Sequence, residues 1–232
     1  MPNFMPALSR FQAAKVLVAG DVMLDQYWFG DVSRISPEAP VPVAKIQETE
    51  HRAGGAANVA RNIAALGGQA ALLAVVGEDE AADTLSKLLA QDNIAGHLIR
   101  SSAAPTTLKL RVLARNQQLI RLDFEAAPDL GSLKTVRQQY AKLVSQYDAV
   151  ILSDYGKGVL NEVAAMIAAA RAAGKPVLID PKGADFSKYA GATLLTPNRA
   201  ELRDAAGGWE NEAGLTAKAQ GLRETLGLDA LL

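Results

Sequence analysis

The chain contains no cysteine among its 232 residues. This absence excludes a disulfide scaffold, a thiol nucleophile and a cysteine-bound metal site, and it suits a reducing cytoplasm. An excess of charge is missing as well, because 24 Lys and Arg residues stand against 25 Asp and Glu residues. With a formal net charge of −1, we expect neither nucleic acid nor an anionic membrane surface as a partner.

Long apolar runs are also lacking. No segment approaches the roughly 18 apolar residues of a membrane span, and the first residues, MPNFMPALSRFQAAK, lack the apolar centre of a signal peptide. Hydrophobic residues nevertheless make up 49% of the chain, enough for a substantial core. These features predict a soluble globular protein of the cytoplasm.

Short apolar segments alternate with helical patterns along the chain. Five segments without polar–apolar alternation are typical of parallel strands covered on both faces: 15–20, 71–77, 149–156, 176–183 and 192–198. Helices are expected at 56–66, 79–91, 132–146, 160–173 and 198–206. This order predicts an α/β fold with a mostly parallel sheet and helices on both faces. The final LGLDALL indicates a helix exit and the start of a strand, so we expect a truncated chain.

Two segments depart from this alternation. Segment 33–50 begins rich in proline and continues as an extended stretch. In segment 106–125, apolar residues alternate with Lys109 and Arg111, and the sequence RNQQ makes a plausible turn into a second strand. The pattern predicts a small sheet, separate from the main one, with one charged face.

Polar residues follow the predicted strands, where open parallel sheets bind their ligands. Asp21 and Asp25 follow the first strand and could accept hydrogen bonds from neighbouring hydroxyls, although each could be an ordinary turn residue. Most lysines are merely solvated, but four cations are candidates for holding a phosphate: Lys109, Arg111, Lys157 and Lys182.

Gly54 and Gly55 stand directly before an alanine-rich helix. Two residues without side chains let a ligand approach backbone amides at the positive end of the helix dipole. Asn58, in the first turn, can hydrogen-bond to hydroxyls. The alternative interpretation of the two glycines is tight packing of the helix against the sheet.

Asn198 and Glu201 have the spacing of a capping box, which marks a helix start. A functional interpretation is that the pair holds a hydrated Mg²⁺, since this ion prefers few protein ligands and several waters. The two interpretations are compatible.

Several stretches, in this order along the chain, resemble the ribokinase/PfkB family of carbohydrate kinases. They extend from about residue 11 to residue 232 and comprise GDVMLDQYWFGDVSRISPEAPVPV, GGAANVARNIAALGG, TLKLRVLARNQQLIRLDFE, LSDYGKG, LIDPKG and LLTPNRAE. Within the family, SRISPEAPVPV and RNQQLIRLDFE are most similar to the subgroup that phosphorylates a heptose 7-phosphate. The resemblance implies a ribokinase-like fold in which segments 33–50 and 106–125 form a β-strand lid that closes over the sugar and joins two copies as a homodimer.

The resemblance also implies roles for particular residues. The sugar hydroxyls would contact Asp21, Asp25, Gly54, Gly55 and Asn58, and the 7-phosphate would be held by Lys109, Arg111 and Lys157. ATP and Mg²⁺ would be bound by Lys182, Asn198, Arg199, Ala200 and Glu201, with Glu201 holding the metal through water. The expected reaction is ATP-dependent phosphorylation of heptose 7-phosphate at O1, for ADP-heptose and lipopolysaccharide core synthesis.

One family feature is missing from the sequence. The catalytic aspartate of the family lies in a D-x-x-G-A-G-D motif that this chain does not contain. A nucleotidyltransferase domain, which accompanies the kinase in bifunctional members, is absent too. We therefore expect an incomplete kinase domain over 1–232 that is close to inactive alone, since a missing base typically costs roughly 10²–10⁴-fold in rate.

Other functions remain open at this point. A kinase for ribose, fructose 1-phosphate or a nucleoside fits the glycine pair and the N-x-x-E motif equally well. A non-catalytic sugar-phosphate-binding protein is a second alternative. A dinucleotide-binding domain is disfavoured, because AGDVML lacks the glycine spacing that a pyrophosphate requires.

Overall fold

The computed structural model describes residues 8–115 and 117–232. Seven parallel strands form its larger sheet: β1 (Lys15–Gly20), β4 (Gln69–Gly77), β5 (Ala95–Ser101), β8 (Ala149–Ser153), β9 (Val177–Asp180), β10 (Leu194–Leu195) and β11 (Ala230–Leu231). Their order across the sheet is β11-β10-β9-β8-β1-β4-β5, and every neighbouring pair is parallel. The predicted α/β class with a parallel sheet is confirmed.

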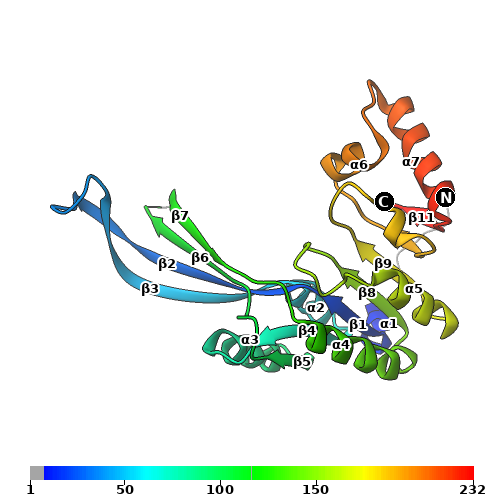
Figure 1. Cartoon of the computed structure of the whole chain (residues 1–232), viewed down its shortest axis with the longest axis horizontal. Helices are drawn as coiled ribbons and strands as arrows, with labels where there is room; N and C mark the ends of the chain where they lie inside the picture. The colour runs from blue at the N-terminus through cyan, green and yellow to red at the C-terminus, as the bar shows by residue number, and fades with distance from the viewer. Residues whose placement is uncertain (1–7, 116) are drawn as a thin grey trace.

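Helices cover both faces of this sheet (Figure 1). They are α1 (Leu8–Ala13), α2 (Ala56–Ala65), α3 (Glu80–Gln91), α4 (Leu130–Leu143), α5 (Val163–Ala172), α6 (Arg199–Ala206) and α7 (Glu212–Leu226), with short 3₁₀ turns at Val144–Gln146 and Ser187–Tyr189. Apolar residues of α2 and α3 pack on one face, around Val18 and Leu72. Those of α4 and α5 pack on the other face, around Leu17 and Leu152.

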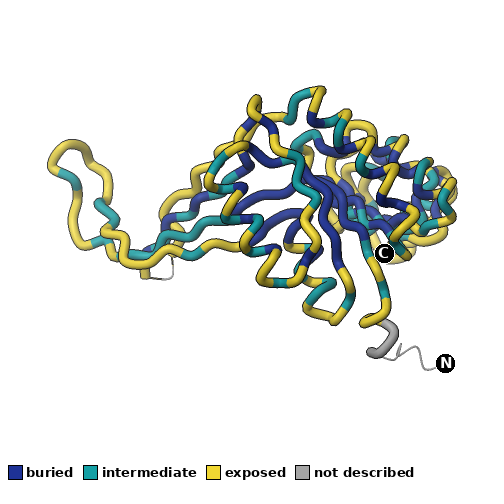
Figure 2. Tube along the Cα trace, turned by 90° about the horizontal axis from the view of Figure 1, so that it is seen from below, coloured by how far each residue is buried: buried dark blue, intermediate teal, exposed yellow. Residues whose placement is uncertain are grey.

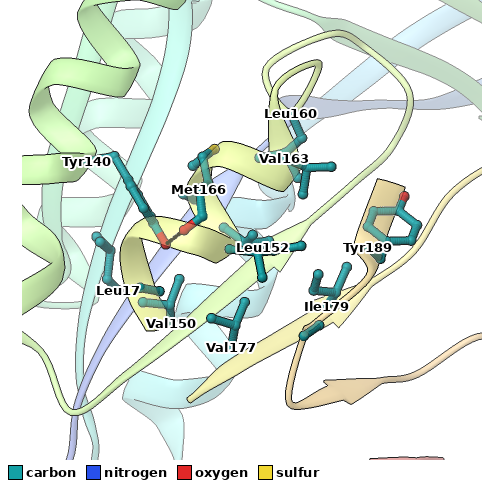
Figure 3. Close-up of a cluster of buried hydrophobic side chains, with 14 of the residues drawn as sticks. Leu17, Tyr140, Val150, Leu152, Leu160, Val163, Met166, Val177, Ile179 and Tyr189 are labelled. Atoms are coloured by element: carbon teal, nitrogen blue, oxygen red, sulfur yellow. Dashed lines mark hydrogen bonds between the residues drawn. The ribbon is translucent and has the colours of Figure 1, made fainter. Parts of the chain in front are cut away.

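The core between α4, α5 and the sheet is shown in Figure 3. Leu152 of β8 and Ile179 of β9 are buried beside Met166 of α5. The hydroxyl of Tyr140, itself buried, donates a hydrogen bond to the backbone oxygen of Met166 at 3.1 Å. The aromatic ring can therefore lie in the apolar layer without an unpaired polar group.

A second, four-stranded sheet extends away from this body (Figure 1). It consists of β2 (Val22–Ile35), β3 (Pro42–Gly55), β6 (Leu108–Ala114) and β7 (Gln117–Phe124), in the order β3-β2-β6-β7. Its outer part is mainly exposed, in contrast to the buried strands of the body (Figure 2). The separate sheet agrees with the alternation in segment 106–125. However, β2 starts only two residues after β1, so Asp25 lies within a strand and not in a turn.

Candidate functional site

A hollow of about 450 Å³ lies where the four-stranded sheet meets the start of α2. This volume is in the range of small-molecule sites. The structure brings six of the sequence-predicted residues to its lining: Asp25, Gly54, Gly55, Asn58, Lys109 and Arg111. Lys157, Lys182 and residues 198–201 do not line it, and neither does Asp21.

Strand register explains how the charged residues reach this hollow. Asp25 in β2 is paired with Arg52 in β3 on one side and with Lys109 in β6 on the other. Tyr27, two residues further along β2, is paired with Arg111. Since side chains alternate between the faces of a strand, all of these residues belong to the same face of the four-stranded sheet.

Positive charge predominates around the hollow. Among its described lining residues, one is a carboxylate, Asp25, and five are cations: Arg52, Arg61, Lys109, Arg111 and Arg121. Arg111 donates through Nη1 to Asp25 at 2.6 Å, and its guanidinium lies 5.1 Å from the centre of the Tyr27 ring. Each of the five cations pairs with a carboxylate, which is Asp25 within the lining or Glu50, Asp92 or Asp123 outside it. The N–H groups that these pairs leave unused favour an anionic ligand, above all a phosphate.

Three of these cations, and Tyr155 at the rim, are absent from the sequence prediction. Arg121 faces the hollow because it is paired with Arg111 across the β6–β7 hairpin. The alternation of β7 could have indicated this position, given the hairpin register. Arg52 and Arg61 carry no local signal, because their role depends on how β3 and α2 pack.

Both glycines before α2 are required by close packing. A Cβ atom on Gly54 would overlap the Asp25 carboxylate and lie 2.7 Å from Cγ of Met23. Gly55 has φ of +60°, and its Cβ would overlap the backbone oxygen of Asp21. Close packing of the end of β3 against the start of β2 therefore requires both glycines, and the same bare backbone also lines the hollow.

Asp21 is buried at the junction of β1 and β2, with only 1% of its surface exposed. Its carboxylate accepts backbone hydrogen bonds from Tyr155 at 2.9 Å, Lys157 at 3.0 Å and Val159 at 3.0 Å. Burial raises the pKa of Asp21 despite these three donors. The residue fixes the loop that carries Tyr155 to the rim of the hollow, and the structure does not bring it to the sugar-binding position expected from the sequence.

Lys157, in the same loop, forms an ion pair with Glu125 at 2.5 Å, just beyond the end of β7. Its expected place beside a phosphate with Lys109 and Arg111 is not seen, since it does not line the hollow. Lys157 instead connects the loop after β8 to the four-stranded sheet.

The second predicted group lies at the start of α6. Asn198 accepts hydrogen bonds from the backbone of Ala200 at 2.9 Å and Glu201 at 3.0 Å, while Glu201 accepts one from the backbone of Asn198 at 3.1 Å. The predicted capping box is confirmed. Lys182 donates to the other oxygen of Glu201 at 3.1 Å, and Arg199 pairs with Glu212.

Asp180 at the end of β9 faces this group. Burial raises the pKa of Asp180, and the negative charge of Glu201 raises it further. Burial likewise raises the pKa of Tyr155, as do the charges of Asp180, Asp25 and Glu201. Tyr155 therefore stands within electrostatic reach of both the hollow and the α6 carboxylate. In residues 8–115 and 117–232, no group of three or more His, Asp or Glu residues is arranged to hold a metal by itself.

Comparison with known proteins places these features in a family. Residues 13–230 match the pattern of the pfkB family carbohydrate kinases. The chain is 53% identical to D-beta-D-heptose 7-phosphate kinase of Bordetella bronchiseptica, over 99% of this chain and 73% of that protein. It is 54% identical to the bifunctional protein HldE of Shewanella amazonensis, over 97% of this chain but only 47% of that protein.

Solved structures show the same fold at low sequence identity. Phosphofructokinase-2 of Escherichia coli superposes with a TM-score of 0.74 at 21% identity, covering 93% of this chain and 71% of that one. Arabidopsis thaliana ribokinase, in a complex with ribose and ATP, superposes with a TM-score of 0.67 at 18% identity, covering 95% of this chain and 71% of that one. The family match covers most of the chain, and the parallel sheet and the solved structures agree with it. The chain belongs to the pfkB family of carbohydrate kinases.

Proposed function

We propose that the chain carries the sugar-phosphate site of a kinase that transfers the γ-phosphoryl group of ATP to O1 of D-glycero-β-D-manno-heptose 7-phosphate. The product, a 1,7-bisphosphate, would feed ADP-heptose and lipopolysaccharide core synthesis. The observation that carries the proposal is the hollow itself, in which polar sugar-binding groups stand beside five cations. The 53% identity to a heptose 7-phosphate kinase supports the choice of sugar.

The sugar would lie against the bare backbone of Gly54 and Gly55. Asp25 and Asn58 supply a carboxylate and an amide, which can bind neighbouring hydroxyls. Lys109 and Arg111 would hold the 7-phosphate, since both line the same hollow. An unphosphorylated pentose carries no anionic group for these cations to bind, so they favour a sugar phosphate over ribose.

ATP with Mg²⁺ would bind at the start of α6, through Lys182, Asn198, Arg199, Ala200 and Glu201. The donor set fits a hydrated Mg²⁺, because this ion takes few protein ligands and prefers oxygen, and Asp180 at the end of β9 and Glu201 at the start of α6 are carboxylates. Asp180 and Glu201 would hold the ion, Glu201 through water. A bound Mg²⁺ would neutralise phosphate charge, and Lys182 would add a further cation.

Transfer itself depends mainly on positioning and on charge stabilisation. Residues of this chain would bind and orient the acceptor, and Tyr155 contributes to the lining of the hollow. The chain spans 73% of the Bordetella kinase and about half of the bifunctional relatives. It contains no D-x-x-G-A-G-D motif, so sugar binding is the step to test on this chain.

The four-stranded sheet would act as a lid and as the contact between two copies in a homodimer. Its face opposite the charged one carries apolar residues of β6 and β7, with Leu110 paired to Leu122. Ile120, Leu122 and Phe124 are 50%, 41% and 49% exposed, as expected of a surface that a second copy covers.

Among the described helices, none has the length and apolar character needed to cross a bilayer. We place the reaction in the cytoplasm, where ATP is supplied.

The proposal is tested by titration calorimetry of the chain with heptose 7-phosphate, ribose, fructose 1-phosphate and a nucleoside. We expect heptose 7-phosphate to bind at least about tenfold more tightly than the others, because each well-formed bond to a charged group contributes about 1.5–3 kcal/mol. Preference for another ligand of the panel would contradict the assigned sugar. ADP release with Mg²⁺ and ATP, measured on a longer chain that includes the aspartate motif, tests the transfer step.

A further inference from the structure

Arg61 differs in origin from the other cations of the hollow. Arg52, Lys109, Arg111 and Arg121 lie on strands of the four-stranded sheet. Among the described lining residues, Arg61 is the cation that comes from α2, which packs on the larger sheet. A ligand held by Arg61 and by an arginine of the four-stranded sheet would therefore contact both parts of the protein.

Arg61 lines the hollow from the side of α2, together with Asn58. It follows Asn58 by three residues in α2, and residues at this spacing lie on the same helix face. Its Nε donates to Asp92 at 2.5 Å, and Asp92, directly after α3, is not part of the lining. Among the hydrogen bonds of the described residues, this one engages Nε alone, so both Nη groups of Arg61 are available to another acceptor.

Arg111 also has N–H groups that are available to another acceptor. Its Nη1 donates to Asp25 and to the backbone oxygen of Lys109, at 2.6 Å and 3.3 Å. Within the described part of the chain, Nε and Nη2 of Arg111 take part in no hydrogen bond. By contrast, Arg52 and Arg121 each direct two nitrogens to a single carboxylate, Glu50 and Asp123 respectively.

We infer that Arg61 and Arg111 together hold the phosphate group of a sugar phosphate, and that Arg61 determines specificity for phosphorylated over unphosphorylated sugars. Guanidinium forks suit this task, because two parallel N–H donors match the oxygens of a phosphate. Asp92 is a positioning residue that orients Arg61 through Nε. The inference rests on the proposed function and adds a phosphate ligand from α2.

The test measures, by titration calorimetry, the affinities of heptose 7-phosphate and of unphosphorylated heptose for the wild-type chain and three variants. Arg61→Gln should weaken binding of the phosphorylated sugar by roughly 10–100-fold, the range expected for lost bonds to a charged group. Binding of unphosphorylated heptose should change by less than about twofold. Arg137→Gln, which breaks an exposed ion pair between α4 and Glu162, is the matched control and should change neither affinity.

Asp92→Asn separates phosphate binding from a purely structural role of the Arg61–Asp92 pair. It keeps the Arg61 charge, so the affinity for heptose 7-phosphate should fall by less than in Arg61→Gln. Equal losses in the two variants, or equal losses for both sugars in Arg61→Gln, would overturn the inference while leaving the proposed function in place. A wild-type chain that binds neither sugar would overturn the proposed function and this inference with it.

Discussion

The carboxylate of Asp21 accepts a hydrogen bond from the backbone N–H of Val159 at 3.0 Å, across 138 positions of the sequence. The other oxygen of the same carboxylate accepts the backbone N–H groups of Tyr155 and Lys157. One buried side chain thus holds the loop after β8 against the junction between the two sheets. In this structure the carboxylate of Asp21 serves as a clamp for a neighbouring loop.

Asp21→Asn tests this clamp. The amide brings an NH₂ group against at least one backbone N–H, so the free energy of unfolding should fall by about 3 kcal/mol. Denaturant unfolding measures this change, and hydrogen exchange should show faster exchange at Lys157 and Val159. An unchanged free energy of unfolding would contradict the clamp, and a loss of sugar affinity without faster exchange in this loop would indicate a ligand role for Asp21.

Gly54→Ala tests the packing beside the hollow. The new Cβ would displace the Asp25 carboxylate, which now pairs with Arg111, so we expect sugar-phosphate affinity to fall. Stability should decrease by about 1–3 kcal/mol, as is usual for overpacking. Gly96→Ala is the matched control, because a Cβ there meets its nearest neighbour, Leu89, at an ordinary 3.4 Å. Unchanged affinity in Gly54→Ala would show that Asp25 plays no part in sugar binding.

Two substitutions at the start of α6 separate capping from metal binding. Asn198→Ala removes the cap and should lower the free energy of unfolding by about 1 kcal/mol. Glu201→Gln keeps an acceptor for the backbone of Asn198 but removes the charge, so it should change stability less and weaken binding of Mg²⁺ with ATP more. Thermal unfolding and nucleotide titration with and without Mg²⁺ measure the two effects. If both variants changed the free energy of unfolding and the affinity for Mg²⁺ with ATP to the same extent, Glu201 would act in capping alone.

The pH dependence of stability should depend partly on Asp79. Burial opposes ionisation, but hydrogen bonds from Thr106 and from the backbone of Ala82 hold the pKa of Asp79 below its usual value. A carboxyl with a lower pKa in the folded state stabilises the protein above its unfolded pKa, about 4, and loses this effect as the pH falls. Unfolding measured from pH 6 to pH 3 should therefore show a smaller decline for Asp79→Asn than for the wild type. If the free energy of unfolding fell equally with pH in the wild type and in Asp79→Asn, Asp79 would not contribute to the pH dependence of stability.

If two copies form a homodimer through the apolar face of the four-stranded sheet, a charged side chain in that face should separate them. Leu122→Lys places an ammonium group in the apolar face of β7, so light scattering should show a shift from dimer to monomer. Leu66→Lys, at an exposed apolar position that follows α2, is the matched control and should leave the mass unchanged. A wild-type monomer at all concentrations would contradict the homodimer.

Features that depend on near neighbours in the chain could be predicted from the sequence. The capping box at Asn198 and Glu201 was recognisable because its partners are three residues apart. Lys109 and Arg111 share a face because side chains alternate along a strand. The apolar runs of β1, β4 and β8 marked the parallel sheet, whereas β5, a mixed and partly exposed edge strand, had no such run.

Tertiary structure alone decided which residues meet at the site. Arg52 and Arg61 reach the hollow from β3 and α2, and nothing in their local sequence distinguishes them from solvated arginines, whereas Arg121 reaches it through its pairing with Arg111. Asp21 bonds to the backbone of the loop after β8 and Lys157 pairs with Glu125, and neither residue lines the hollow. The physical reason is the range of the interactions: propensity, alternation and capping act over a few residues, while register between strands and burial of a carboxylate depend on partners dozens of residues away.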